Sequence, residues 1–407
     1  MPWLQTGLTM LVLGITYLGL AMGQWPGLSL NRAAIALVGA AAVMGLGVVT
    51  LPQAWQAIDP TTIVFLFSLM IVNLYLGYGG FFNLVLQQML GLTRSPWGLL
   101  VLLSLGSGLL SAFFLNDTLV LVGTPLVLAM TTALNLNPIP YLLALAGATN
   151  IGSVATLSGN PQNILIGSLS GISYGLFARQ LAPVAILGIV IQLTWLWWLY
   201  PEIRVWEPVP VVVLSKLRLL QPLLTKSLWV AGLMLAGFMV GLPLGPVALT
   251  AAAVLLVIGG IKAERVLRQV DGMLLLLFAG LFILTQATRH LNLLESLTPV
   301  VANPWGLAGL TVVLSNLISN IPAVLLLAPL IAPDDTQAWL LLATSATLAG
   351  NLSLFGSVAN LIVVEAARSK GHHLSFREHL RFGLPLTLIT VGLAHVWVYN
   401  VGIFRGL

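Results

Sequence analysis

Long apolar segments alternate with short polar breaks along almost the entire chain. Each segment approaches the length of about 20 residues that a helix needs to cross the hydrocarbon of a bilayer. A more polar stretch at 201–227 separates two series of such segments. The first series lies near 8–23, 32–51, 61–81, 96–135, 139–171 and 182–200, and the second near 228–243, 246–262, 272–288, 304–333, 338–367 and 383–402. The pattern predicts an all-α polytopic membrane protein embedded in the lipid bilayer.

The two series carry the same short motifs in the same order. The matching pairs are Pro96 with Pro304, Ser111 with Ser315, Asn116 with Asn320, Gly159 with Gly356 and Asn163 with Asn360. Agreement of several pairs in one order indicates an internal repeat, which is common in secondary transporters. The chain therefore divides into a first repeat (1–205), a cytoplasmic linker (206–227) and a second repeat (228–407).

The fourth segment of each repeat is predicted to be a re-entrant hairpin. In 304–333, the break at Ser319-Asn320-Ile321-Pro322 leaves arms of about 15 and 12 residues, which are too short to cross the membrane. The equivalent 96–135 segment, split at Asn116-Asp117-Thr118, is assigned as a hairpin through the repeat. Each repeat then has five spans plus a re-entrant hairpin. An odd number of crossings makes the second repeat inverted.

The few basic residues lie in loops between the apolar segments. With the N-terminus outside, only Arg179, Arg289 and Arg405 fall on the outer side, as the positive-inside rule requires. This placement predicts a multi-pass protein of the inner (plasma) membrane and argues against a nucleic-acid partner, despite the net charge of +5. No basic residue precedes Arg32, so the first apolar run lacks the positive region of a signal peptide and is expected to remain as a span.

The composition also limits the chemistry. The chain has no cysteine, which excludes disulfides, thiolate metal sites and cysteine nucleophiles. An intramembrane enzyme would need a His-Glu-x-x-His motif or paired aspartates at membrane depth, and the sequence has neither. We therefore predict that the protein is not an enzyme and has no cofactor.

Glycine, asparagine and proline interrupt the fourth and fifth segments of both repeats, which predicts broken helices that line a cavity. Restarting helices direct free N–H groups and positive dipole ends into such a cavity. Carbonyl groups with Asn116, Asp117 and Asn320 would suit Na⁺. These asparagines could instead only satisfy broken backbone, and Asp117 could be a helix cap. The predicted substrate- or ion-binding residues are Asn116, Asp117, Thr118, Asn150, Gly159, Asn160, Asn163, Ser319, Asn320, Asn351, Gly356, Ser357 and Asn360.

The four interrupted motifs together resemble the ion transporter superfamily. They are Ser111-Ala-Phe-Phe-Leu-Asn-Asp-Thr118, Asn150–Asn163, Ser315-Asn-Leu-Ile-Ser-Asn-Ile-Pro-Ala323 and Gly350–Asn360. This superfamily includes arsenite permeases, citrate–metal transporters, divalent anion–sodium symporters and NhaD-type antiporters. The resemblance implies a transport domain formed by the breaks, a scaffold that forms a homodimer, and an elevator-type alternating-access mechanism.

The sequence thus predicts a secondary active transporter of a small inorganic or organic anion, coupled to Na⁺ or H⁺. A Na⁺/H⁺ antiporter and an arsenite-type efflux permease of the same fold are the alternatives. A passive ion channel is the alternative from a different class, because hairpins also line pores.

Overall fold

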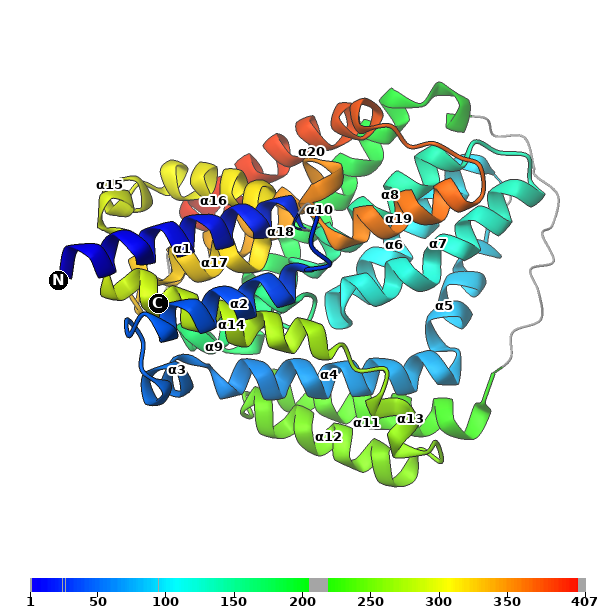
Figure 1. Cartoon of the computed structure of the whole chain (residues 1–407). Coiled ribbons are helices and arrows are strands. Elements are labelled where there is room, and N and C mark those ends of the chain that lie inside the picture. The colour runs from blue at the N-terminus through cyan, green and yellow to red at the C-terminus, as the bar shows by residue number, and fades with distance from the viewer. Residues whose placement is uncertain (1, 24, 26, 94, 205–218, 402–407) are drawn as a thin grey trace.

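The computed structural model describes residues 2–23, 25, 27–93, 95–204 and 219–401. Within these residues all regular elements are helices, and most of them lie along one common direction (Figure 1). Part of the predicted linker, 206–218, lies outside the described residues, and so do Arg94 and Arg405.

The first half of the chain forms ten α-helices. They are α1 (Pro2–Met22), α2 (Arg32–Gly45), α3 (Leu51–Ala57), α4 (Pro60–Gly79), α5 (Phe81–Leu90), α6 (Pro96–Phe113), α7 (Asn116–Ala133), α8 (Pro138–Ser153), α9 (Pro161–Ser170) and α10 (Tyr174–Leu199). Local sequence explains most of their starts. Asn31, Asp59, Ser95 and Asn160 accept a hydrogen bond from the first turn of α2, α4, α6 and α9, and Pro60, Pro96 and Pro161 follow three of these caps.

The second half of the described chain also forms ten α-helices. They are α11 (Gln221–Met239), α12 (Leu244–Ile258), α13 (Ala263–Leu267), α14 (Gly272–His290), α15 (Thr298–Val301), α16 (Pro304–Ile318), α17 (Asn320–Leu327), α18 (Thr336–Leu348), α19 (Val358–Ser369) and α20 (Phe376–Val396). The 3₁₀ turns η4 (Ala349–Asn351) and η5 (Leu354–Gly356) connect α18 to α19. Long and short helices follow in the same order in both halves.

Seven helical segments of the described chain are long and apolar enough to cross a membrane. They are Trp3–Met22, Pro60–Gly79, Pro96–Phe113, Tyr174–Leu199, Gln221–Met239, Gly272–His290 and Phe376–Val401. The broken segments α8–α9 and α18–α19 do not qualify as single helices, and α2 and α12 have only 14 and 15 residues. The structure therefore supports a polytopic protein, whereas ten crossings remain a prediction. Because α6 itself has spanning length, the first hairpin is also still a prediction.

Two pairs of helices pack across the two halves of the chain. In Figure 1, α14 lies beside α2 and α4 lies beside α12, and both pairs are in extensive contact. Close approach in the first pair requires Gly280, since a Cβ there would lie 2.9 Å from the backbone of Ala36. His290 at the end of α14 bonds to the Val48 carbonyl just after α2, so these helices run in the same direction.

The second pair, α4 with α12, has the same parallel arrangement. Gly245 near the start of α12 faces Thr61, and Gly259 at its end faces Tyr75, so α12 and α4 are parallel too. If consecutive spans alternate in direction, parallel α2–α14 and α4–α12 pairs require α1 and α11 to point in opposite directions. This is the packing that an inverted repeat would produce.

The chain breaks close to the expected positions at both hairpin tips. In the first, Phe114 and Leu115 separate α6 from α7, so Asn116, Asp117 and Thr118 form the first turn of α7 and not the break itself. In the second, Ser319 alone separates α16 from α17. Pro161 and Pro322 lie in the first turns of α9 and α17, where the N–H that proline lacks would have no helical partner.

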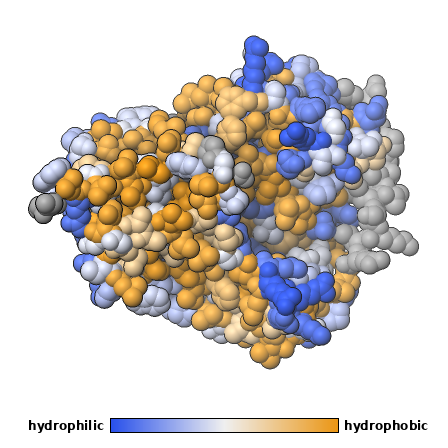
Figure 2. All heavy atoms as spheres, viewed as in Figure 1, coloured by the Kyte–Doolittle hydropathy of each residue, from blue (hydrophilic) through white to orange (hydrophobic). Residues whose placement is uncertain are grey.

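The surface agrees with a bilayer environment. Figure 2 shows apolar side chains over most of the visible face, including the part that α1 covers in Figure 1. Hydrophilic side chains gather instead toward one end, where α13 carries the exposed ion pair of Glu264 and Arg268 at 2.6 Å. An apolar face bounded by charged ends is typical of a membrane protein.

Candidate functional site

The tips of both predicted hairpins present a helix N-terminus that has no side-chain cap. α7 begins at Asn116 after Leu115, and α17 begins at Asn320 after Ser319. Neither Leu115 nor Ser319 bonds to the first turn through its side chain, whereas a serine caps α6 and an asparagine caps α16. At α7 the Asn116 amide donates to the Gly159 carbonyl at 3.2 Å, but no side chain covers the positive end of either helix, which favours an anionic or polar ligand there.

A cavity of about 130 Å³ lies between these tips. At about 30 Å³ per water molecule in the liquid, it has room for about four waters or for a small ion. Pro161 and Gln162, at the start of α9, form part of its wall. The predicted site residues that line the cavity are Asn116, Asp117, Ser319, Asn320, Gly356 and Ser357. Segments that are far apart in the sequence thus meet at one cavity.

The cavity also contains Arg32, which the sequence analysis missed. Arg32 is the first residue of α2, whereas the charge pattern places it in a cytoplasmic loop between apolar segments. It is half-buried, and its Nε atom is enclosed without a hydrogen-bond partner in the described part of the chain. A signal existed in the sequence, because Arg32 is the only basic residue among the first 93 and it opens an apolar segment.

Asn150 does not line the cavity but connects the motifs behind it. Its Nδ2 donates to Oδ1 of Asn351 at 2.8 Å, which joins the two broken segments. Its Oδ1 accepts from Asn116 Nδ2 at 3.1 Å and from Ser357 Oγ at 3.2 Å. Asn150 and Asn351 are 2% and 1% exposed, so these bonds form away from bulk water. The two predicted residues act as positioning residues.

Asn163 and Asn360 hold their own breaks together in the same way. Asn163 Nδ2 donates to the carbonyls of Ser153 and Thr156 at 2.9 and 3.0 Å. Asn360 Nδ2 donates to the carbonyls of Gly350 and Ser353 at 2.8 and 2.9 Å. In both cases the acceptors lie ten and seven residues earlier in the chain. These asparagines satisfy broken backbone, the alternative role that the sequence left open.

The glycines of the two motifs permit these tight turns. A Cβ on Gly159 would lie 2.5 Å from the Ser153 carbonyl oxygen, and one on Gly356 would lie 2.9 Å from the Gly350 carbonyl oxygen. Only Gly356 also reaches the cavity. Thr118 does not line it; its amide donates to the Leu115 carbonyl within the first tip.

Each of the two breaks is also bonded to the other half of the chain. Asn160 caps α9 and donates to Thr347 Oγ1 of α18 at 3.2 Å. Ser357 caps α19 and donates to Asn150 of α8 at 3.2 Å. Because each cap reaches across to the other half, a movement of one break affects the other.

A comparison with known protein families identifies the family of this chain. The model that describes the citrate transporter family (CitMHS) matches residues 17–339. The chain belongs to the citrate transporter family. This places it in the ion transporter superfamily that its motifs resemble, and it is therefore a membrane transporter.

Relatives of this citrate transporter family member agree on transport. The silicon efflux transporter LSI3 of Oryza sativa subsp. japonica is 31% identical over 448 residues, covering 90% of this chain and 92% of LSI3. An uncharacterized transporter of Mycobacterium bovis is 31% identical over 400 residues, covering 91% and 93%. The YdaH transporter of Alcanivorax borkumensis has a similar fold, with a TM-score of 0.57, 16% identity and coverage of 98% and 99%. The predicted all-α membrane fold is confirmed.

The tip of the second hairpin has a strained backbone. Ser319 has φ 80° and ψ 158°, a region that is nearly restricted to glycine. Its counterpart Leu115 in the first hairpin has φ −53° and ψ 123°, which is relaxed. The strain therefore belongs to one repeat only, and Ser319 lies in the cavity wall. Strain of this kind is often found at ligand sites.

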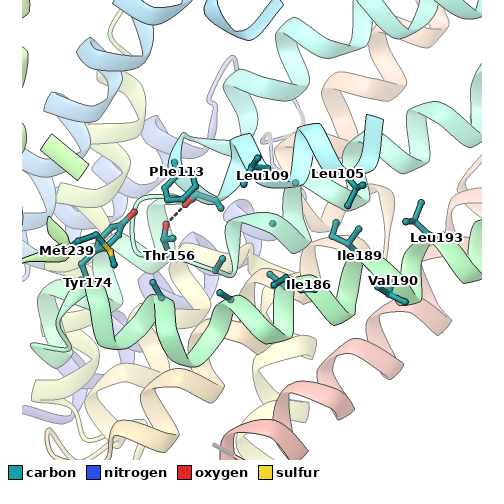
Figure 3. Close-up of a pocket in the computed structure, with 17 residues that line it drawn as sticks. Leu105, Leu109, Phe113, Thr156, Tyr174, Ile186, Ile189, Val190, Leu193 and Met239 are labelled. Carbon is teal, nitrogen blue, oxygen red and sulfur yellow. Dashed lines mark hydrogen bonds between the residues drawn. The ribbon is translucent and has the colours of Figure 1, made fainter. Parts of the chain in front are cut away.

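A larger cavity of about 500 Å³ lies between α6 and α10 and is separate from this site (Figure 3). Aliphatic side chains such as Leu109, Ile186 and Ile189 form most of its walls, and Met239 of α11 contributes to one end. The Thr156 hydroxyl beside it is bonded to the Ala112 carbonyl. With so few polar groups, this cavity does not suit an ion.

Across the described residues, no three His, Asp or Glu side chains gather as they would around a transition metal. A cation in this family member would instead use the asparagines, Asp117 and backbone carbonyls of the first cavity. Such hard oxygen ligands match an alkali cation.

Proposed function

We propose that this citrate transporter family member is a secondary active transporter that binds a small anion in the cavity between its hairpin tips. The observation that carries the proposal is the meeting of Arg32 with the uncapped N-termini of α7 and α17 in one cavity. A guanidinium and two helix N-termini all favour negative charge. The Arg32 Nε atom, enclosed without a partner, has an unused donor for such a ligand.

Asp117 gives the cavity a second role. It is the only carboxylate among the residues that line it. A carboxylate beside a bound anion is unfavourable unless a cation lies between them. We therefore place a coupling Na⁺ near Asn116, Asp117 and Asn320, with H⁺ as the other candidate coupling ion.

The walls of the cavity support an elevator-type mechanism. Leu20 belongs to α1, Arg32 to α2, and Leu274 and Leu277 to α14, which are scaffold helices in the proposal. The remaining wall comes from the hairpins and breaks, the proposed transport domain. A site between two such bodies changes its access when one moves along the other. The inverted repeat, with its parallel α2–α14 and α4–α12 pairs, and a homodimer formed by the scaffold belong to the same proposal.

The substrate is proposed only as a class. The family name refers to citrate and LSI3 is named for silicon efflux, so the names of relatives differ in cargo. A cavity of about 130 Å³ is small compared with the roughly 300–1,000 Å³ of drug-sized sites, which favours a small inorganic or organic anion. The proposed location is the plasma membrane with the N-terminus outside.

Flux measurements in proteoliposomes test the proposal. A panel of arsenite, sulfate, phosphate, dicarboxylates and citrate would be tested for concentrative uptake driven by a Na⁺ or H⁺ gradient. Arg32→Gln is expected to raise the KM of the transported anion at least tenfold, because a charge-assisted hydrogen bond contributes about 1.5–3 kcal/mol. Arg268→Gln is the matched control, since Arg268 is 77% exposed and far from the cavity lining.

The Na⁺/H⁺ antiporter is the second candidate, and the lone cavity carboxylate favours it. In that mechanism Asp117 would itself exchange the two ions, and Asp117→Asn would abolish all ion movement. In the anion carrier, the same variant should lose Na⁺ dependence and retain some anion exchange. Wild-type Na⁺/H⁺ exchange without any anion would refute the anion carrier, and downhill flux without accumulation would indicate a channel.

A further inference from the structure

His379 is a buried titratable residue directly behind the second broken segment. It lies in the first turns of α20 and is 2% exposed. Its Nε2 is 3.1 Å from the carbonyl oxygen of Asn351, the last residue of η4. Asn360 Nδ2 lies farther from the same nitrogen, at 3.5 Å, and donates its own hydrogens to two carbonyls of the break. Because a carbonyl only accepts, the shorter contact assigns the proton to Nε2. Nδ1 is then an acceptor, and it is buried without a hydrogen-bond partner in the described part of the chain.

The surroundings of His379 favour a neutral ring in this conformation. A second proton on Nδ1 would be a buried charged donor with no acceptor, and the positive end of α20 would oppose it. His379 forms no ion pair within the described residues. The charged or titratable groups on the elements around it are Tyr141 of α8, Tyr174 and Arg179 of α10, Glu365 and Arg368 of α19, Arg377, Glu378, Arg381 and His395 of α20, and Tyr399.

The histidine is present in one repeat only. Ser173 and Ser375 cap α10 and α20 in the same way. Phe177 and His379 are each the fourth residue after these caps, so they occupy equivalent positions in the two helices. Phe177 is 0% exposed, so the fold accepts an apolar ring at this site. A titratable residue is therefore not needed to build a helix behind a break.

Hydrogen bonds connect His379 to the cavity. The Asn351 residue that accepts from the imidazole also accepts at its side chain from Asn150, at 2.8 Å. Asn150 in turn accepts from Ser357, which lines the cavity. A displacement of Asn351 is thus transmitted through Asn150 to the ligand site.

We propose that His379 is a proton-binding site that controls the second broken segment, residues 349–357. In the present conformation the neutral imidazole holds the Asn351 carbonyl. When this segment moves away, water reaches Nδ1 of His379, which then takes up one proton. When the segment closes again, the proton returns to water. Acidic pH therefore favours the open segment. The inference rests on the proposed transport function only for its consequence, namely that proton binding is coupled to ligand access.

Cysteine labelling tests the proposal without a substrate. The chain has no native cysteine, so Ser353→Cys, at a position that is 8% exposed, reports opening of the segment. Its reaction with a water-soluble maleimide would be compared in two proteins that differ only by His379→Gln. Glutamine can still donate to the Asn351 carbonyl but does not titrate. Because the two proteins share the same thiol, their rate ratio removes the intrinsic pH dependence of the reagent.

The labelling rate of the protein with His379, divided by that of the His379→Gln protein, is expected to rise about tenfold from pH 7.5 to pH 5.5. The reason is that an imidazole in water titrates near pH 6.5 and that opening is linked to the uptake of one proton. A ratio that is constant within about twofold would overturn the proposal. His379→Phe, the residue of the first repeat, should be as insensitive to pH as His379→Gln, and Leu352→Cys provides a second reporter. A pH-dependent ratio in a protein that moves no anion would refute only the anion carrier. A constant ratio in a protein that does move an anion would refute only the role of His379.

Discussion

Asn150→Ala removes the side chain that connects the first hairpin, the first break and the second break. The variant loses three hydrogen bonds, to Asn116, Asn351 and Ser357. Side-chain hydrogen bonds between membrane helices contribute about 0.6 kcal/mol on average, so the expected loss of stability is about 2 kcal/mol. For a chain of 407 residues, an unfolding entropy of about 2 cal/mol/K per residue makes this a decrease in Tm of about 2 °C. Transport should fall more strongly, because Asn116 and Ser357 lose their orientation at the cavity.

The assay is thermal unfolding in detergent, followed by the fluorescence of the 12 tryptophans. Asn83→Ala is the matched control, since Asn83 is half-buried in α5 and its side chain makes no hydrogen bond within the described chain. A double-mutant cycle with Asn351→Ala should give a coupling of about 0.6–1.7 kcal/mol for the 2.8 Å bond. If Asn150→Ala melts like Asn83→Ala and the cycle shows no coupling, the role of Asn150 is refuted.

Three further predictions concern the tips and the topology. Asn116→Ala and Asn320→Ala should each abolish transport without preventing membrane insertion, and near-normal uptake in both would contradict a site shared by the two repeats. Ser319→Gly should stabilise the protein by about 1 kcal/mol, because glycine relieves the backbone strain. Leu115→Gly, at the relaxed counterpart before α7, should destabilise it. Equal Tm shifts in the two variants would argue against the strain. Cysteine in place of Ser215, which lies outside the described residues, should be labelled only from the cytoplasm, and cysteine in place of Asp335 only from outside. Labelling of both from one side would exclude the inverted repeat.

The sequence alone determined the class of protein and the segments that form the site. Apolar runs of spanning length require a bilayer as solvent, and an internal repeat needs only a comparison of the chain with itself. Asparagine, glycine and proline interrupt helices for local reasons, so the tips at Asn116 and Asn320 and the breaks before Asn163 and Asn360 could be located within a few residues. The types of these residues also indicated their chemistry.

The tertiary structure alone decided which of these residues face the cavity and which brace it. Asn116 and Asn163 are equally plausible ligands in the sequence, but only the fold brings Asn116 to the cavity and aims Asn163 at two carbonyls of its own break. Arg32 and His379 lie outside every interrupted motif. Arg32 lines the cavity and His379 contacts the second break because α2 and α20 pack against elements distant in the chain. Contacts of this kind depend on the packing of whole helices, which local sequence does not encode.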